Sequence, residues 1–282
     1  MNANGSGSLS SLPRSLVVMT AAAFGLMGLV LFIAPPWAAA NFSWNISPLV
    51  AMTMGGWYLG SAVMAGLVAY HQRWNVIRAS VLYVGIFSLT EAVVLVIHSA
   101  KLKLDALLAW PYIGMLALAG LASLVVLFDW IRQRPTLADE GAPAPAWVRG
   151  IVVSFAVFVF FLSGVAFSGY SVGLNGGIFP EPLSLFTLRS FGAFYFSLAF
   201  STLALLGVRQ LAAVTAHVWG GLALILLITV AALVYFRAFN FADRPFQSIY
   251  LGVYLGALVV ALSYLGYERA RRKGLPAGEK TA

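Results

Sequence analysis

The sequence predicts an all-α, polytopic membrane helix bundle with about eight transmembrane helices. Of its 282 residues, 61% are hydrophobic and only 9% are charged, whereas soluble domains carry roughly a quarter of their residues as Asp, Glu, Lys and Arg. Mean hydropathy is +0.90, and apolar runs of about 20 residues, the length of one bilayer crossing, recur along the whole chain. These runs are too long and too unalternating for barrel strands, so helices are expected.

Each apolar run is expected to form one helix. The predicted spans cover residues 15–34, 49–70, 77–98, 107–128, 149–170, 188–208, 215–236 and 247–267. The first run also resembles a secretory signal, because Arg14 precedes it and small residues at 38–40 follow it. Its length from Leu16 to Ala34 exceeds the roughly 7 to 15 residues of a signal core, and further spans follow at once, so we expect it to be retained.

The basic residues predict the orientation. If the spans alternate, twelve of the 17 Lys and Arg residues fall on one side of the membrane and five on the other. Because basic loops stay in the cytoplasm, both termini should be cytoplasmic, and a plasma membrane is the expected location. The net charge of +8 forms no basic patch with interleaved aromatic residues, so nucleic acid is not an expected partner.

A polar segment divides the chain nearly in half. Residues 132–148 contain prolines, acidic residues and arginines, which is typical of a cytoplasmic linker. It separates a first four-span unit, 15–131, from a second, 149–267. We expect residues 1–14 to be a disordered cytoplasmic N-terminus. Residues 268–282 form a basic cytoplasmic tail, for which anionic lipid is the predicted partner.

The two units are predicted to be repeats. A shift of 137 positions, without gaps, superposes Phe42 on Phe179, Ser47 on Ser184, Gly55 on Gly192, Tyr58 on Tyr195 and Ala62 on Ala199. Few other columns match. A unit with an even number of spans repeats in the same orientation, so the two halves would be parallel and related by an axis along the membrane normal.

The first outer connection is rich in aromatic residues and carries no charge. Residues 35–48 include Trp37, Phe42 and Trp44. Aromatic rings are favoured at the membrane surface, so this segment is expected to rest in the interface. Plain spacing between two spans is the alternative.

Glu91 is the clearest ionisable residue inside a predicted span. A carboxylate at membrane depth costs roughly 2.5 to 3.5 kcal/mol on insertion scales, so it needs a partner, a wet cavity or a proton. His98 lies two turns further along nearly the same helical face, and Arg189 lies at the outer end of the sixth span. These three residues form the candidate intramembrane polar site.

Two arrangements of this site are open. In the first, Arg189 is the counterion of Glu91, and the charges are complementary between the two halves. In the second, Arg189 extends to the lipid headgroups, and a neutral Glu91 is hydrogen-bonded to a neighbouring backbone.

The residues of the usual membrane enzymes and cofactors are missing. His98 and His217 should lie about a membrane thickness apart, so they cannot ligate one haem, and a hydrogen-bonded histidine near the interface is the simpler expectation for each. With no cysteine, thiolate metal sites and disulfides are excluded. The lysines fall outside the spans, and no phosphate-binding or metalloprotease motif is present. The sequence therefore predicts no catalytic residues, no cofactor, no metal site and no enzyme.

The leading functional hypothesis is a non-enzymatic scaffold or accessory component that acts through helix and lipid contacts, with a membrane-protein partner or a second copy of the chain. The alternative is a transporter or channel for a proton or small solute that uses Glu91 as its titrating group. Transport predicts a water-reachable cavity at Glu91. Action of an enzyme on a lipid is a distant third hypothesis.

Overall fold

The computed structural model describes residues 7–135, 145–170, 177–206 and 211–274. Within these ranges the chain forms nine α-helices, and the only β pairing is an isolated bridge between Ser8 and Arg73. The helices are α1 (Ser11–Ile33), α2 (Pro35–Ala40), α3 (Pro48–His71), α4 (Trp74–Ile97), α5 (Ala109–Gln133), α6 (Ala146–Ser168), α7 (Leu185–Leu203), α8 (Leu211–Val234) and α9 (Gln247–Gly274). Single 3-10 turns follow α4 and α8. The all-α prediction is confirmed.

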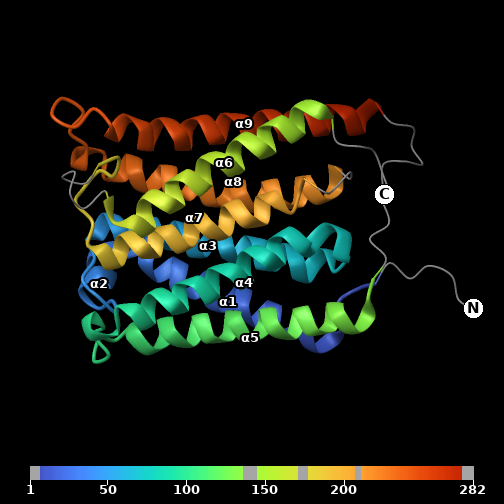
Figure 1. Cartoon of the computed structure of the whole chain (residues 1–282), viewed down its shortest axis with the longest axis horizontal. Helices are drawn as coiled ribbons and strands as arrows, with labels where there is room; N and C mark the ends of the chain where they lie inside the picture. Colours follow the sequence, from blue (N-terminus) through green and yellow to red (C-terminus); the bar gives the residue numbers. More distant parts are fainter. Residues whose placement is uncertain (1–6, 136–144, 171–176, 207–210, 275–282) are drawn as a thin grey trace, which may run out of the picture.

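Seven of these helices are long and apolar enough to cross a membrane. The chain is therefore a multi-pass integral membrane protein in contact with lipid. The two helices outside this set are the short α2 and the longer α7, which contains Arg189 and several serines and is largely buried within the bundle. Like the seven apolar helices, α7 runs along the long axis of the molecule (Figure 1).

The predicted spans match the long helices, but the ends differ for local reasons. The first helix begins at Ser11 instead of residue 15, so residues 11–14 are helical, with Pro13 in the first turn where its missing N–H costs nothing. The fourth continues to Gln133 instead of 128 because its polar last turn finds partners. The backbone N–H and the hydroxyl of Ser10 bond to Asp129 at 3.0 and 2.7 Å. Residues 136–144 of the predicted linker lie outside the described residues.

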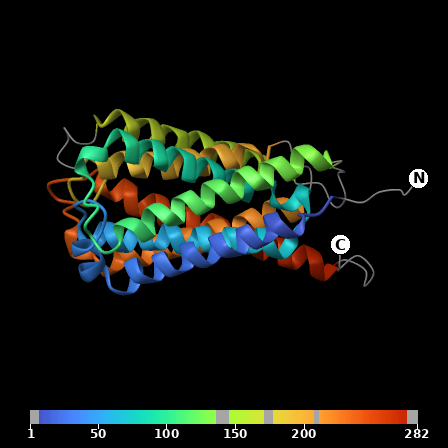
Figure 2. The ribbon, with the colours of Figure 1, turned by 90° about the horizontal axis from the view of Figure 1, so that it is seen from below.

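The long helices lie side by side, and α5 and α9 form opposite edges (Figure 1). In the middle, α3 packs on α8 and α4, and α4 packs on α7 and α8, while α1 packs on α3, and α6 on α7. The start of α1 and the end of α9 lie at the same end of the bundle (Figures 1 and 2). Among the seven apolar spans, α3 is the most deeply buried.

Glycines let these helices approach closely. A Cβ at Gly55 of α3 would lie 2.6 Å from the Phe32 backbone nitrogen in α1. On the other side of α3, a Cβ at Gly60 would lie 2.6 Å from the Leu224 Cβ in α8. Since atoms cannot approach that closely, these crossings require glycine, as expected of small residues at membrane helix interfaces.

Candidate functional site

Glu91 lies in α4 and is completely enclosed. Its residue exposure is 1%. The Tyr112 hydroxyl of α5 donates a hydrogen bond to Glu91 Oε1 at 2.7 Å, and the Tyr58 hydroxyl of α3 donates to the Tyr112 oxygen at 3.1 Å. Three helices of the first unit thus meet at one buried polar chain, in which the carboxyl oxygen is the final acceptor.

Aromatic rings pack around this group of hydrogen-bonded side chains. The Tyr112 ring has Phe42 at 5.0 Å and Trp44 at 5.5 Å, both in edge-to-face contact. Phe87 packs against the Tyr58 ring at 6.0 Å. Edge-to-face packing of this kind adds about 0.5 to 1.5 kcal/mol per pair beyond area burial.

The second carboxyl oxygen of Glu91 faces the other half of the chain. Oε2 makes no hydrogen bond that meets standard geometry within the described residues. The hydroxyl of Ser190 in α7 lies beside the carboxyl group and is likewise unsatisfied by that criterion. Among the described residues, the polar neighbours of the Glu91 carboxyl group are thus the hydroxyl groups of Tyr112 and Ser190.

His98 and Arg189, in contrast, contact each other. Arg189 Nη1 lies 3.2 Å from His98 Nε2, and the imidazole stacks on the Phe186 ring at 4.8 Å. Burial and the positive charges of Arg189 and Lys101 lower the pKa of His98 below its usual value. Because a guanidinium can only donate hydrogen bonds, His98 Nε2 is the acceptor in this contact and the ring proton lies on Nδ1.

The three predicted site residues thus form two separate groups. His98 and Arg189 come together at the C-terminal end of α4, while Glu91 is bonded to Tyr112. No ion pair between Glu91 and Arg189 is present in the described part of the chain. Thr90 donates to the Ile86 carbonyl of its own helix at 2.7 Å, so it does not extend a polar track from Glu91. Glu91 lines none of the three cavities discussed below.

Trp44 is a central residue whose role the sequence did not indicate. It comes from the segment between α2 and α3, yet its exposure is only 2%. The indole N–H donates to the Thr187 hydroxyl of α7 at 3.1 Å, and the indole stacks on Phe186 at 4.3 Å. An interfacial position was expected for this segment, but Trp44 instead inserts between the two halves. The one sequence feature that marked this segment is its aromatic residues without a charged neighbour.

A second link between the halves lies at the same end. The Ser47 hydroxyl donates a hydrogen bond to Glu181, which precedes α7. Burial raises the pKa of Glu181, and the Ser47 bond offsets part of that rise. The segment between α2 and α3 is therefore tied both to α7 and to the segment that precedes α7.

Two hollows open on different faces of the bundle. The larger is an apolar groove of about 1240 Å³ along α4 and α5. The other is a pair of small adjoining cavities among α6, α7, α8 and α9. Among the described residues, no three His, Asp or Glu side chains gather in a way that would hold a metal ion.

Comparisons with family models, with curated proteins and with solved structures give no match. Function must therefore be inferred from the residues of this chain.

Proposed function

We propose that the chain is a non-enzymatic membrane scaffold or accessory component that holds a transmembrane helix of a partner protein in the groove along α4 and α5. The groove is the one observation that carries this proposal. Its lining runs from Trp74 at the start of α4 to Val96 near its end. At 1.5 Å per residue this is about 33 Å, which matches the hydrocarbon thickness of a bilayer.

The walls of the groove suit a helix. Its floor includes Gly85 of α4 and Ala117 and Gly120 of α5, and small residues let helix backbones approach within membranes. Leu89 and Leu121 line the groove and are 67% and 53% exposed. The volume also exceeds the roughly 300 to 1,000 Å³ of ordinary small-molecule pockets.

Arg78 adds a polar group at one end of the groove. It lies one turn into α4, and its Nη2 donates to the Ala204 carbonyl at 3.3 Å. A partner helix with an acidic residue or a free carbonyl at that end would complement it. An acyl chain would fill the same volume, but its binding does not require small residues in the floor of the groove.

The enclosure of Glu91 favours the scaffold over transport. A proton or solute pathway through Glu91 needs water access, and the carboxyl group is sealed by Tyr112 and the surrounding rings. Its hydrogen bond to Tyr112 gives Glu91 a structural role in joining α4 to α5. The proposal therefore assigns Glu91 to the packing of the helices and not to a reaction.

We also propose that α7 is the eighth span and that the two halves are duplicated four-helix units. Three of the matched columns have equivalent surroundings. Ser47 and Ser184 each cap the following helix by accepting a backbone N–H at 3.1 Å, in α3 and α7 respectively. Tyr58 bonds to Tyr112 in α5, and Tyr195 bonds to Tyr254 in α9.

The glycines and the helix packing support the same relation. Gly55 approaches α1, the first helix of its unit, and Gly192 approaches Phe167 of α6, the first helix of the other. Helix α3 packs on α8, and α4 packs on α7. If α3 corresponds to α7 and α4 to α8, the contact of α3 with α8 is equivalent to the contact of α7 with α4. A pseudo-two-fold axis along the membrane normal requires this equivalence.

An even number of spans accommodates the proposed orientation, with both termini on the cytoplasmic side of a plasma membrane. The basic segment beyond residue 268 continues α9 as a helix to Gly274, and Arg271 pairs with Glu268 at 3.2 Å. We propose that the remaining basic residues there contact anionic lipid, at about 1 kcal/mol for each.

Cross-linking from the groove tests the scaffold proposal. The chain has no cysteine, so Gly120→Cys places a single thiol on the groove floor, and Gly114→Cys places the control thiol on α5 outside the groove. With a benzophenone attached to each thiol in native membranes, we expect Gly120→Cys alone to capture one protein, through a peptide within a transmembrane segment. Capture of lipid only, or equal products from both positions, would overturn the proposal. Capture of a second copy of this chain would identify the groove as a homo-oligomer interface and would also overturn it.

A further inference from the structure

Arg189 of α7 carries a positive charge that no acidic side chain of the described structure offsets. It forms no ion pair in the described part of the chain, and the residue is only half-buried. A guanidinium has five N–H groups that donate hydrogen bonds and no acceptor. Among the described residues, His98 accepts one of these N–H groups. Several donors of Arg189 are therefore available to a ligand.

His98 holds this guanidinium in place. The imidazole is 7% exposed and stacks on the Phe186 ring at 4.8 Å, and its Nε2 lies 3.2 Å from Arg189 Nη1. With Nη1 engaged by His98, the edge of the guanidinium formed by Nε and Nη2 remains. That edge presents two parallel N–H groups, the arrangement that binds a phosphate or a carboxylate through two hydrogen bonds.

Lys101 brings a second positive charge to the same place. It ends the 3-10 turn Ser99–Lys101 that follows α4, and its backbone N–H donates to the His98 carbonyl at 2.8 Å. Lys101 is exposed and forms no ion pair with a described residue. The positive charges of Arg189 and Lys101 both lower the pKa of His98, so both lie near the imidazole. Two cations beside one neutral ring attract an anion.

These charges lie at the end of a membrane-spanning helix. Helix α4 is one of the seven apolar spans and ends at Ile97, immediately before His98. Arg189 is only about 6 Å along α7 from the start of that helix. On α4, Val93 and Ile97 lie one turn apart and are 51% and 58% exposed. Apolar surface thus continues from the charged groups, as a ligand with an anionic head and acyl chains requires.

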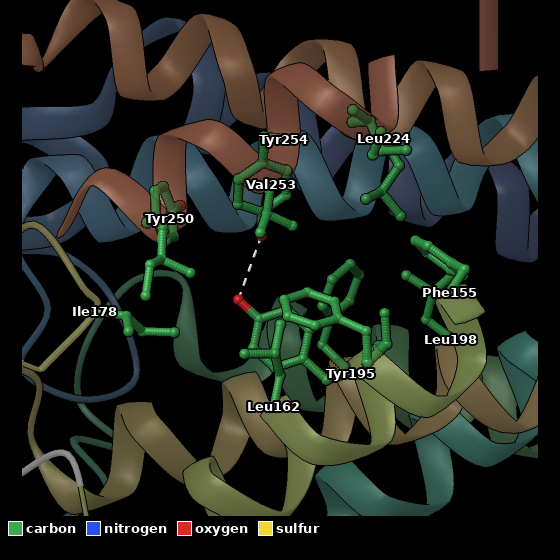
Figure 3. A pocket seen from close by; sticks show the side chains of 15 residues that line it. Phe155, Leu162, Ile178, Tyr195, Leu198, Leu224, Tyr250, Val253 and Tyr254 are labelled. Carbon is green, nitrogen blue, oxygen red and sulfur yellow. Dashed lines mark hydrogen bonds between the residues drawn. The ribbon is translucent and has the colours of Figure 1, made fainter. Parts of the chain in front are cut away.

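The two small cavities among α6, α7, α8 and α9 offer no comparable site. Figure 3 shows the smaller one, of about 40 Å³, with the Tyr195 and Tyr254 hydroxyls joined beside it at 3.3 Å. With the adjoining cavity of about 120 Å³, it has room for a few water molecules or one very small molecule. No Lys or Arg is among the described residues that line the two cavities. An anionic ligand is therefore expected at the lipid-facing surface and not in the interior.

We infer that Arg189 and Lys101 bind the phosphate of an anionic phospholipid, whose acyl chains lie against Val93 and Ile97. His98 is the positioning residue of this site, because it holds the guanidinium and does not touch the phosphate. Lys101 repels a headgroup that carries its own cation, which favours phosphatidylglycerol over phosphatidylcholine. Arg189, His98 and Lys101 do not line the groove along α4 and α5, so the site does not depend on the partner proposed for that groove.

Lipid binding to the full chain in detergent micelles tests the inference, with native mass spectrometry as the measurement. Phosphatidylglycerol and phosphatidylcholine with the same acyl chains are the two probes, and inorganic phosphate is the competitor. Phosphatidylglycerol should fill a saturable site that phosphatidylcholine fills at least tenfold more weakly. Millimolar phosphate should not displace it, because free phosphate gains nothing from Val93 and Ile97. Displacement by phosphate, or equal binding of the two lipids, would overturn the inference.

Single charge removals locate the site. Arg189→Gln should weaken phosphatidylglycerol binding about tenfold or more, and Lys101→Gln about fivefold. The matched control is Arg237→Gln, because Arg237 is exposed and lies in the 3-10 turn after α8, as Lys101 lies in the turn after α4. The basic segment beyond residue 268 is the same in all three variants, so lipid bound there contributes equally to each. Binding by Arg189→Gln as tight as that by Arg237→Gln would contradict the site.

Further variants separate the positioning of Arg189 from folding. His98→Leu removes the acceptor of Arg189 Nη1 and should weaken binding about threefold, whereas His98→Gln keeps an acceptor and should restore it. Equal binding by the two His98 variants would refute the positioning role. If Arg189→Gln lacks the elution profile of a folded chain, unchanged binding by Lys101→Gln would overturn the inference, since the exposed Lys101 can be changed without loss of the fold. Release of a protein instead of a lipid from native membranes by Arg189→Gln would assign the site to an acidic partner and would also overturn it.

Discussion

The Tyr112 hydroxyl donates a 2.7 Å hydrogen bond to Glu91 Oε1, and this contact joins α5 to α4 in the interior of the first unit. It occupies one of the two oxygens of the Glu91 carboxyl group. Hydroxyl groups and aromatic rings thus surround the one acidic side chain that the sequence places deep in the membrane. The carboxyl group is part of the packing of three helices.

Removing the Tyr112 hydroxyl should therefore destabilise the fold. Tyr112→Phe leaves Glu91 Oε1 buried and unpaired, at a cost of about 1 to 3 kcal/mol. Tyr58→Phe removes only the hydrogen bond from Tyr58 to Tyr112 and should cost about 1 kcal/mol. Thermal unfolding in detergent micelles measures both. The control is Tyr70→Phe, because Tyr70 is 77% exposed. Equal midpoints for Tyr112→Phe and Tyr70→Phe would remove the structural role assigned here to the Glu91 contact.

Glu91→Gln should be nearly neutral. The carboxamide oxygen accepts the same hydrogen bond from Tyr112, so we expect the stability to change by less than about 1 kcal/mol. Neither the wild type nor the variant should carry pH-dependent flux in proteoliposomes. A proton flux in the wild type that Glu91→Gln abolishes would restore the transport hypothesis in place of the scaffold.

Trp44 should contribute strongly to the contact between the halves. Thr187→Val removes the acceptor of the indole N–H and leaves it buried and unpaired, which should cost about 1 to 3 kcal/mol. In a Trp44→Phe chain that donor is absent, so the same Thr187→Val change should cost much less. A double-mutant cycle on unfolding free energies measures the difference. Additive costs would show that the bond between Trp44 and Thr187 adds nothing.

His98 should make stability depend on pH. Its pKa is lowered in the folded chain, so the unfolded chain binds more protons and stability rises with pH. The stabilisation is complete above the ordinary histidine pKa of about 6.5 and is lost as the pH falls through the lower folded-state pKa. His98→Gln keeps an acceptor for Arg189 but does not titrate. The fall in unfolding midpoint between pH 7.5 and pH 5 should be smaller in this variant, and an unchanged fall would contradict the assignment.

The two matched glycines should differ in their tolerance of a methyl group. A Cβ at Gly55 meets backbone atoms of α1, which cannot move alone, whereas a Cβ at Gly192 meets only the Phe167 ring at 2.9 Å. Gly55→Ala should therefore destabilise by about 1 to 3 kcal/mol, and Gly192→Ala by less. Gly66→Ala is the control, because Gly66 has no neighbour within 4 Å. A lower unfolding midpoint for Gly192→Ala than for Gly55→Ala would contradict the requirement for glycine at the contact of α1 with α3.

The fold was largely predictable because apolar length alone identifies membrane helices. The shift of 137 positions pairs Ser47 with Ser184, and each of these serines caps the helix that follows it. What could not be predicted is how the helices rotate about their axes. That rotation turns Glu91 toward Tyr112 and sends Arg189 to His98. Nothing local in the outer connection indicates that Trp44 inserts into the core, since an interfacial tryptophan has the same neighbours in sequence.

The scaffold proposal depends most directly on occupancy of the groove along α4 and α5. Gly120→Phe fills its floor, and Gly114→Phe adds the same ring to α5 outside the groove. The measurement is the amount of the cross-linked partner that co-purifies with each variant from native membranes, relative to the wild type. The account predicts at least a tenfold loss for Gly120→Phe and no loss for Gly114→Phe. Equal recovery from both variants would contradict it.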